Sequence, residues 1–280
     1  MSHGALPNLI IIGAMKCATT SLHFYLDLHP DISMSRRKEL NFFSQEESWV
    51  KGEDWYRAWF DADAPVRGEA SPSYSHVHRF PGVPARMRTL VPEAKLIYLV
   101  RDPVRRLLSH YRHMVAERKE DRPLVEVLEE ENSALVTRSL YTFQLEQYLS
   151  HFPMDQILVV QQERLLADRQ GVMSGIYSFL GVDPEFRSIL FKHRRHRSVR
   201  KRRKTELGLK ISRLSALRAI SRFPDPLRWL VEDLIFFPFS HRVHPPELPP
   251  GIADRLHEHF RRDTNRLREL TGQSFEGWVV

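Results

Sequence analysis

The sequence predicts an α/β domain in which a central, mostly parallel sheet lies between helices, giving three layers. Apolar runs of strand length, at residues 9–12, 95–100 and 156–161, alternate with longer segments of helical periodicity. This alternation is typical of parallel strands joined by crossover helices on the two faces of a sheet. With 280 residues, 42% of them hydrophobic, and no internal repeat, we expect one domain over residues 1–280.

The turn after the first apolar run has the features of a phosphate-binding loop. Residues 9–12 end at Gly13, and three hydroxyl-bearing residues at 19–21 begin a helix that we expect to reach residue 28. Free N–H groups at a helix N-terminus attract anions, and Lys16 adds a full positive charge. The residues expected to bind the anion are Lys16, Cys17, Ala18, Thr19, Thr20 and Ser21.

The spacing in this turn differs from the phosphate loop of nucleotide triphosphatases. That loop requires Gly, four residues, and then Gly-Lys followed by Ser or Thr. Here Lys16 follows Gly13 by three positions, with Met15 before it and Cys17 after it. The second glycine and the magnesium-binding hydroxyl are both missing, so a nucleotide kinase is only an alternative, and one that requires ATP and magnesium.

A second strand-to-helix junction carries Arg101, Asp102 and Pro103 at the end of the run 95–100. Pro103 suits the first position of a helix, where a backbone N–H is not needed. Ser109 follows about two turns later, so its hydroxyl and the Arg101 guanidinium can converge on one phosphate. The chain therefore offers a second anion site at the end of another strand.

Together these motifs resemble the sulfotransferases that use 3′-phosphoadenosine 5′-phosphosulfate (PAPS), including bacterial members. Residues 13–21 are similar to the family's 5′-phosphosulfate loop, Gly-x-x-Lys-Ser/Thr-Gly-Thr-Thr/Ser, with Cys17 and Ala18 in place of Ser/Thr and Gly. Residues 101–109 resemble its 3′-phosphate motif, Arg-Asp-Pro with a Ser eight residues after the Arg. The resemblance covers residues 6–190 best and implies a P-loop-like fold, PAPS as co-substrate and no required metal.

The segment between the two motifs supplies candidate catalytic residues. Residues 36–43 resemble the Lys-Glu-x-x-Phe-Phe segment of the heparan and carbohydrate branch of the family. The resemblance implies that Glu39 deprotonates the acceptor and that Lys16 stabilises the departing bridging oxygen, each effect being worth about 100-fold or more in rate. Glu69 is a competing carboxylate, although Ala70 stands where the heparan enzymes have a lysine. Further candidates are Lys38 and His110.

These assignments predict transfer of a sulfuryl group from PAPS to a hydroxyl or amine of a carbohydrate or small-metabolite acceptor. The identity of the acceptor, the choice between O- and N-sulfation, and the oligomeric state do not follow from the motifs.

The positive charge of the chain is concentrated in one segment. The net charge is +7, and residues 192–204 contain nine Lys or Arg and no acid, so the remainder is slightly negative. We therefore do not expect a general nucleic-acid-binding protein. In similar sulfotransferases a basic loop here closes over the 3′-phosphate, which implies roles for Arg197 and Ser198. The alternatives are a noncatalytic protein that binds polyanions through this segment, or peripheral contact with an acidic membrane surface.

Residues 205–250 resemble the family least. They include Leu207 and Ile211 at helical spacing and a strongly apolar segment at 227–237. Because acceptor specificity commonly resides in variable segments beside a fixed site, we expect 192–250 to be a variable basic loop followed by helices that cover the acceptor. Packing of these helices against the core is the alternative. The tail, with a helical apolar face over 252–267, resembles the family's terminal docking helix.

The remaining observations concern location, redox state and metals. No apolar run approaches the ~20 residues that cross a bilayer, the start lacks the charge of a signal peptide, and there is one cysteine. We therefore expect a cytoplasmic protein. Cys17 has two interpretations: it is simply a small residue that the loop tolerates, or it is a thiol whose pKa is depressed by Lys16 and the helix start. The histidines form no convincing zinc ligand set, but His76, His78 and His110 are candidates to assist the acceptor.

Overall fold

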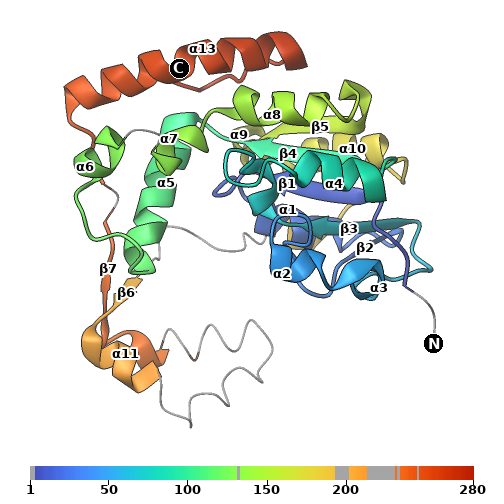
Figure 1. The fold of residues 1–280 in the computed structure, drawn as a ribbon, viewed down its shortest axis with the longest axis horizontal. Helices are drawn as coiled ribbons and strands as arrows, with labels where there is room; N and C mark the ends of the chain where they lie inside the picture. Colours follow the sequence, from blue (N-terminus) through green and yellow to red (C-terminus); the bar gives the residue numbers. More distant parts are fainter. Residues whose placement is uncertain (1–3, 131–132, 193–201, 213–230, 232–233, 245) are drawn as a thin grey trace.

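The computed structural model describes residues 4–130, 133–192, 202–212, 231, 234–244 and 246–280. Its centre is a five-stranded sheet of order β2-β3-β1-β4-β5, and each neighbouring pair is parallel. Helices cover the two faces of this sheet (Figure 1). The strands are β1 (Leu9–Gly13), β2 (Ile32–Met34), β3 (Val66–Ala70), β4 (Lys95–Val100) and β5 (Ile157–Gln161). The predicted fold class is therefore confirmed.

The helices follow the expected order along the chain. The α-helices of this part are α1 (Thr19–Leu26), α2 (Glu46–Trp49), α3 (Gly52–Arg57), α4 (Val83–Leu90), α5 (Pro103–Ala116), α6 (Leu124–Glu129), α7 (Ala134–Thr137), α8 (Tyr141–Leu149), α9 (Gln162–Ala167) and α10 (Arg169–Leu180). Short 3-10 turns are η1 (Pro72–Ser75), η2 (Met154–Gln156) and η3 (Ile189–Lys192).

Helix α8 follows a short break in the helical chain. Residues 138–140 separate it from α7. Ser139 lies in this break, where its hydroxyl accepts a hydrogen bond from Arg106 Nε at 2.7 Å. A contact from α5, more than thirty positions earlier in the chain, therefore accompanies the change of direction.

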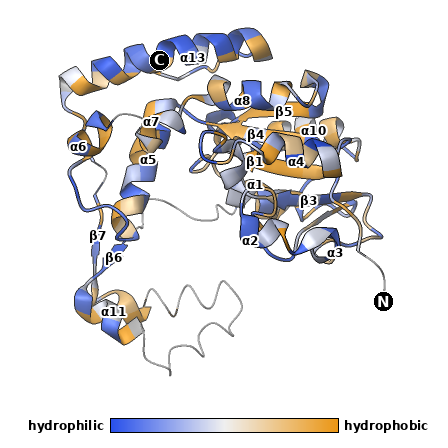
Figure 2. Cartoon of the chain, viewed as in Figure 1, coloured by the Kyte–Doolittle hydropathy of each residue, from blue (hydrophilic) through white to orange (hydrophobic). Residues whose placement is uncertain are grey.

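The core lies on the two faces of the central strands. Residues 9–12 of β1 and 96–100 of β4 are fully buried, and most of these residues are hydrophobic (Figure 2). Strands covered on both faces read as continuous apolar runs, which is why they were visible in the sequence. Ile11 of β1 is in register with Ala70 of β3 and Ile97 of β4. The carboxyl ends of these three strands therefore meet at one edge, where α/β sheets bind ligands.

The C-terminal segment packs back onto the sheet. Helix α13 (Pro250–Thr271) contacts α8 and α5, with Phe260 and Leu267 buried. The chain then returns to β5, where Gln161 Nε2 donates to the carbonyl of Glu276 at 2.9 Å. The terminal helix therefore docks as the sequence pattern predicts, slightly longer at both ends.

A separate extension begins near the end of α5. It contains the antiparallel strands β6 (Arg202–Lys204) and β7 (Ser240–Arg242) with α11 (Glu206–Ser212), and it projects away from the sheet (Figure 1). Leu207, Leu234 and Phe237 are exposed on it, so these apolar side chains do not pack against the core. Residues 213–230 lie outside the described part of the chain. Within that part, no helix combines the length and the apolar character needed to cross a membrane.

Candidate functional site

The loop between β1 and α1 lies at the carboxyl edge of the sheet. Ala14 N donates to the Leu99 carbonyl of β4 at 2.7 Å, so the loop begins between the ends of two strands. Lys16 and Ala18 have φ angles of 74° and 69°. This left-handed conformation costs a non-glycine residue about 1 kcal/mol or more, which explains why a glycine is usual at the position of Ala18. The turn places the N-terminus of α1 at the same edge, where it can attract an anion.

Cys17 is a buried, free thiol in this loop. Its Sγ lies 3.8 Å from the Tyr141 hydroxyl and 3.9 Å from the Met15 carbonyl. Burial raises the pKa of the Cys17 thiol to about 11, because the loss of solvation outweighs the nearby positive charges of Arg106 and Arg101. Of the two interpretations of Cys17, the depressed pKa was therefore wrong.

The second predicted anion site lies at the end of β4, beside this loop. Arg101 follows the strand, and Asp102 caps α5 by accepting from Arg105 N at 2.8 Å. The Ser109 hydroxyl on α5 is buried and has no hydrogen-bond partner among the described residues. A buried hydroxyl without a partner costs about 1–3 kcal/mol, so this oxygen is suited to a ligand acceptor such as a phosphate oxygen.

Tyr141 of α8 connects the two predicted halves of the donor site. Its hydroxyl donates to the Arg101 carbonyl at 2.7 Å and lies beside Cys17 Sγ. It is fully buried, and its ring packs 5.9 Å from that of Trp278. Aromatic residues at helical spacing usually indicate only core packing, so local sequence did not distinguish this residue.

The C-terminal tail fixes the Arg-Asp-Pro motif from the other side. Val279 N donates to Asp102 Oδ2 at 3.0 Å, although the two residues are 177 positions apart. Glu163 accepts from Asp102 N at 3.2 Å and from Trp278 Nε1 at 3.2 Å. These contacts hold the residue that follows Arg101, and sequence reasoning missed them because no local pattern marks a pairing over such a distance.

Glu39 lies at the rim of the same edge. Its backbone N–H donates to the Ala70 carbonyl at the end of β3 (3.0 Å), and β3 is paired directly with β1. Glu39 therefore stands at the strand end next to the Lys16 loop. Its carboxylate is 53% exposed, and Lys38 Nζ donates to it at 2.5 Å.

Glu69, by contrast, lies inside the protein. It is 0% exposed. Its carboxylate accepts hydrogen bonds from Tyr56 at 2.5 Å, Ser71 at 2.7 Å and Tyr74 at 2.7 Å. Burial raises the pKa of Glu69, while these hydrogen bonds and the charge of Lys38 act in the opposite direction.

His110 is also an interior residue. It lies on α5, with Nε2 3.3 Å from Arg138 Nη1. Burial, together with the charges of Arg106 and Arg138, lowers the pKa of His110 well below its ordinary value. The imidazole is therefore neutral at physiological pH.

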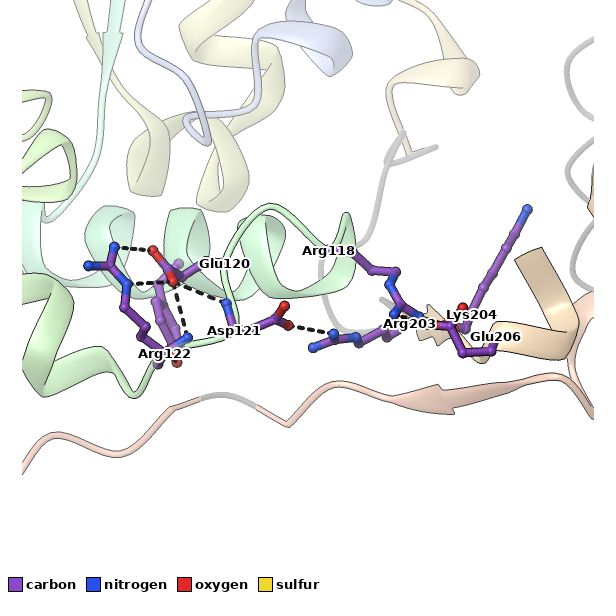
Figure 3. Close-up of polar contacts among 8 residues, drawn as sticks. Arg118, Glu120, Asp121, Arg122, Arg203, Lys204 and Glu206 are labelled. Atoms are coloured by element: carbon purple, nitrogen blue, oxygen red, sulfur yellow. Dashed lines mark hydrogen bonds and ion pairs between the residues drawn. The ribbon is translucent and has the colours of Figure 1, made fainter. Parts of the chain in front are cut away.

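The basic segment is described only at its end. Arg197 and Ser198 lie outside the described residues. In β6, Arg203 pairs with Asp121 at 2.5 Å, and nearby Arg118 pairs with Glu206 (Figure 3). These ion pairs attach the end of the segment to the chain that follows α5.

No metal centre is evident in the described ranges, which contain no group of three or more His, Cys, Asp or Glu side chains arranged as metal ligands. That the reaction needs no metal stays a prediction.

Comparisons with known proteins agree with the motifs. The family model described as "Sulfotransferase domain" matches residues 6–217. Human heparan sulfate glucosamine 3-O-sulfotransferase 3B1 is 30% identical over 98% of this chain, which spans 65% of that protein. A human bifunctional heparan sulfate N-deacetylase/N-sulfotransferase 3 is 32% identical over 65% of the chain and 23% of its own length. A sulfotransferase structure from Alicyclobacillus acidocaldarius has a TM-score of 0.68 at 26% identity, covering 96% of this chain and 97% of that one.

Proposed function

Because the chain belongs to the family of PAPS-dependent sulfotransferases, we propose that it transfers a sulfuryl group from PAPS to a hydroxyl or amine of a carbohydrate or small-metabolite acceptor. The observation that carries this proposal is the meeting of three predicted elements at one sheet edge. They are the Lys16 loop after β1, the Arg101 to Ser109 junction after β4, and Glu39 at the end of β3.

The donor is assigned to the two anion sites. The Lys16 loop and the N-terminus of α1 bind the 5′-phosphosulfate, because backbone N–H groups, hydroxyls and the ammonium are complementary to its charge. Arg101 and the unpartnered Ser109 hydroxyl bind the 3′-phosphate. Arg197 and Ser198 are further candidates for the 3′-phosphate on the resemblance alone.

The proposed reaction is an in-line displacement at sulfur. Glu39 accepts the proton of the acceptor hydroxyl, and the acceptor oxygen forms a bond to sulfur. The bond between sulfur and the bridging oxygen of the 5′-phosphate breaks, and its electron pair stays on that oxygen. Lys16 stabilises the charge that develops there, leaving adenosine 3′,5′-bisphosphate and a sulfate ester.

Exposure favours Glu39 over Glu69 as the base. A general base must come within hydrogen-bond distance of the acceptor proton. The Glu39 carboxylate is 53% exposed, whereas Glu69 is 0% exposed and already accepts three hydrogen bonds. Lys38, bound to Glu39, positions the base. His110 is too deeply buried to meet an acceptor without movement of the chain around it.

The relatives support a carbohydrate acceptor but not one position on it. Their names include both 3-O- and N-sulfotransferases of heparan sulfate, so the choice between oxygen and nitrogen stays open. A cytoplasmic location remains our expectation, as does the absence of a nucleic-acid partner. The exposed apolar residues Leu207, Leu234 and Phe237 leave acceptor covering or peripheral membrane contact as roles for the extension.

Calorimetric titration tests the donor site directly. The wild type is titrated with adenosine 3′,5′-bisphosphate and, separately, with ATP and magnesium. We expect micromolar binding of the bisphosphate that falls at least 100-fold in Lys16→Ala. Lys51→Ala is the matched control, because Lys51 is exposed and lies over the Trp55 ring, outside the site. Binding of ATP with magnesium alone would support the kinase alternative. Salt-sensitive binding of any polyanion without donor specificity would support the noncatalytic binder.

A further inference from the structure

The residues that follow α13 reach the strand end at which the 3′-phosphate is proposed to bind. We call Trp278, Val279 and Val280 the tail segment. Trp278 and Val280 are buried, whereas the side chain of Val279 is exposed and its backbone N–H donates to Asp102 Oδ2 at 3.0 Å. Arg268 on α13 donates to the Val280 carbonyl at 2.8 Å. The tail segment is therefore bound both to α13 and to the Arg-Asp-Pro motif.

Trp278 contacts both groups that hold the backbone of this motif. The Tyr141 hydroxyl donates to the Arg101 carbonyl at 2.7 Å and accepts from Arg101 N at 3.3 Å. Glu163 Oε1 accepts from Asp102 N at 3.2 Å. The Trp278 ring lies 5.9 Å from that of Tyr141, and its Nε1 donates to Glu163 Oε2 at 3.2 Å. One indole therefore supports, from two sides, the backbone that carries the Arg101 side chain.

Val279 supports the helix that carries the second 3′-phosphate candidate. The Asp102 carboxylate caps α5 by accepting from Arg105 N at 2.8 Å, and its other oxygen accepts from Val279 N. Asp102 is 1% exposed, and a buried carboxylate is stable only when hydrogen bonds satisfy its oxygens. Ser109 lies on the helix that this cap begins. Loss of the Val279 donor should therefore disturb both Arg101 and Ser109.

The conformation of the chain before the tail segment is set by specific contacts. Phe275 has a φ angle of 51°, and its ring stacks on that of Trp278 at 4.6 Å. Gln161 of β5 holds the next residue through the Glu276 carbonyl. A left-handed φ is unfavourable for a residue other than glycine and persists where the surrounding structure over-determines it. The tail segment is therefore delivered to the motif in one defined arrangement.

We infer that the tail segment is a positioning element for recognition of the 3′-phosphate. Trp278 and Val279 fix the backbone at Arg101 and Asp102, so that the Arg101 guanidinium and the Ser109 hydroxyl converge on one phosphate. The inference rests on the proposed function and adds how the donor site is held in a binding-competent arrangement. Because coupling between two equilibria is reciprocal, a bound 3′-phosphate also stabilises the docked tail segment.

The test compares two nucleotides that differ only in the 3′-phosphate, adenosine 3′,5′-bisphosphate and adenosine 5′-phosphate. Calorimetry measures their affinities for Trp278→Phe, which keeps a ring but lacks the Nε1 donor, and for Val279→Pro, which lacks the N–H. We expect bisphosphate affinity to fall about tenfold or more in each, the scale of one lost hydrogen bond to a charged group. Affinity for the monophosphate should stay within about twofold, since its contacts lie in the Lys16 loop.

Two control variants match these substitutions. Val279→Ala shortens the exposed side chain and keeps the N–H, so it should bind both nucleotides as the wild type does. Trp59→Phe makes the same change as Trp278→Phe at a half-buried indole that packs on Trp55, outside the site. It should also leave both affinities unchanged. Thermal unfolding verifies that each variant is folded at the temperature of the titration.

A double-mutant cycle tests whether Trp278 acts through Arg101. Arg101→Gln removes the guanidinium and should itself weaken bisphosphate binding. In that background Trp278→Phe should lower bisphosphate affinity by less than about twofold further, because residues that act through one group are not additive. Fully additive losses would show that Trp278 acts elsewhere and would overturn the inference.

Hydrogen exchange in the wild type tests the coupling from the other direction. At saturation, the bisphosphate should slow exchange in the peptide that contains residues 278–280 more than the monophosphate does, and equal protection would contradict the coupling. An unchanged bisphosphate affinity in both tail variants, or an equal loss for the two nucleotides, would also overturn the inference while the donor site stands. If the bisphosphate does not bind to the wild type, the proposed function fails instead.

Discussion

Replacement of the two candidate carboxylates should separate stability from catalysis. Glu69→Ala removes the acceptor of three buried hydroxyls, those of Tyr56, Ser71 and Tyr74. Each buried hydroxyl left without a partner costs about 1–3 kcal/mol, so we expect a loss of about 3–9 kcal/mol in unfolding free energy. For a domain of this size, about 1 kcal/mol shifts the melting temperature by roughly 2–4 °C, which predicts a fall of about 6 °C or more.

The same substitution at Glu39 should have the opposite profile. Its carboxylate is 53% exposed and interacts with Lys38, and such surface changes usually stay within about 0.5 kcal/mol. We therefore expect Glu39→Ala to melt within about 2 °C of the wild type. Removal of a general base should lower kcat by about 100- to 10,000-fold.

Thermal unfolding is monitored by circular dichroism. Turnover is measured with labelled PAPS and an acceptor that the wild type sulfates. Glu69→Gln is the decisive control, because its amide oxygen still accepts from both tyrosines. We expect Glu69→Gln to keep more than a tenth of the wild-type kcat and Glu39→Gln to lose at least 100-fold. If Glu69→Gln is stable but inactive while Glu39→Gln is active, the assignment of the base is refuted.

Three further predictions concern burial. Because the pKa of Cys17 is raised from 9.0 to about 11, its alkylation by iodoacetamide at pH 8 should be at least about 100-fold slower than in the urea-unfolded chain, measured by mass spectrometry; equal rates would contradict its burial. The pKa of His76 is about 2 when folded and 6.5 when unfolded, so the unfolded state binds more protons between these values. Stability should therefore fall as the pH drops below 6.5, by up to about 1.4 kcal/mol per unit, and urea unfolding at pH 7.5 and 5.5 should show a smaller fall in His76→Asn. Trp278→Ala should lose about 3–5 kcal/mol of unfolding free energy, since it stacks on Phe275 and donates to Glu163; a change below 1 kcal/mol would show that the tail is not held as described.

The parts of the candidate site that could be predicted are those formed by a few consecutive residues. The apolar run at 9–12, Lys16 and the hydroxyls at 19–21 identify a strand, a turn and a helix start within a few positions, because burial on both faces gives the strand a continuous apolar run. The helix does begin at Thr19, although its N-cap is Ala18 and no side chain caps it. Arg101 and Ser109 were recognisable for the same reason, because Arg101 follows a strand and Ser109 lies on the next helix along the chain. The order of such units along the chain was sufficient to predict a parallel sheet.

Local reasoning failed where the environment came from distant residues. The loop position of Cys17 suggested an activated thiol, but Tyr141 and the surrounding core cover it and raise its pKa. Arg106 of α5 donates a hydrogen bond to Ser139 in the break before α8, and nothing near either residue in the sequence indicates this contact. Nothing near Asp102 in the sequence indicates that Val279 would donate to it.

Glu39 and Glu69 show most clearly which properties follow from the sequence and which require the tertiary structure. Sequence alone placed Lys16, Glu39 and Glu69 among the candidates, Lys16 from its place in an anion-binding turn and the two glutamates from the resemblance of their segments to motifs of the family. Only the tertiary structure decided that Glu39 stands at the rim and Glu69 lies inside with three hydroxyl partners. It also brought Arg79, His76, His110 and Arg138 into one cluster from three separate segments. Exposure, hydrogen bonding and charge are properties of neighbours in space, and the neighbours of a buried group are set by how the whole chain packs.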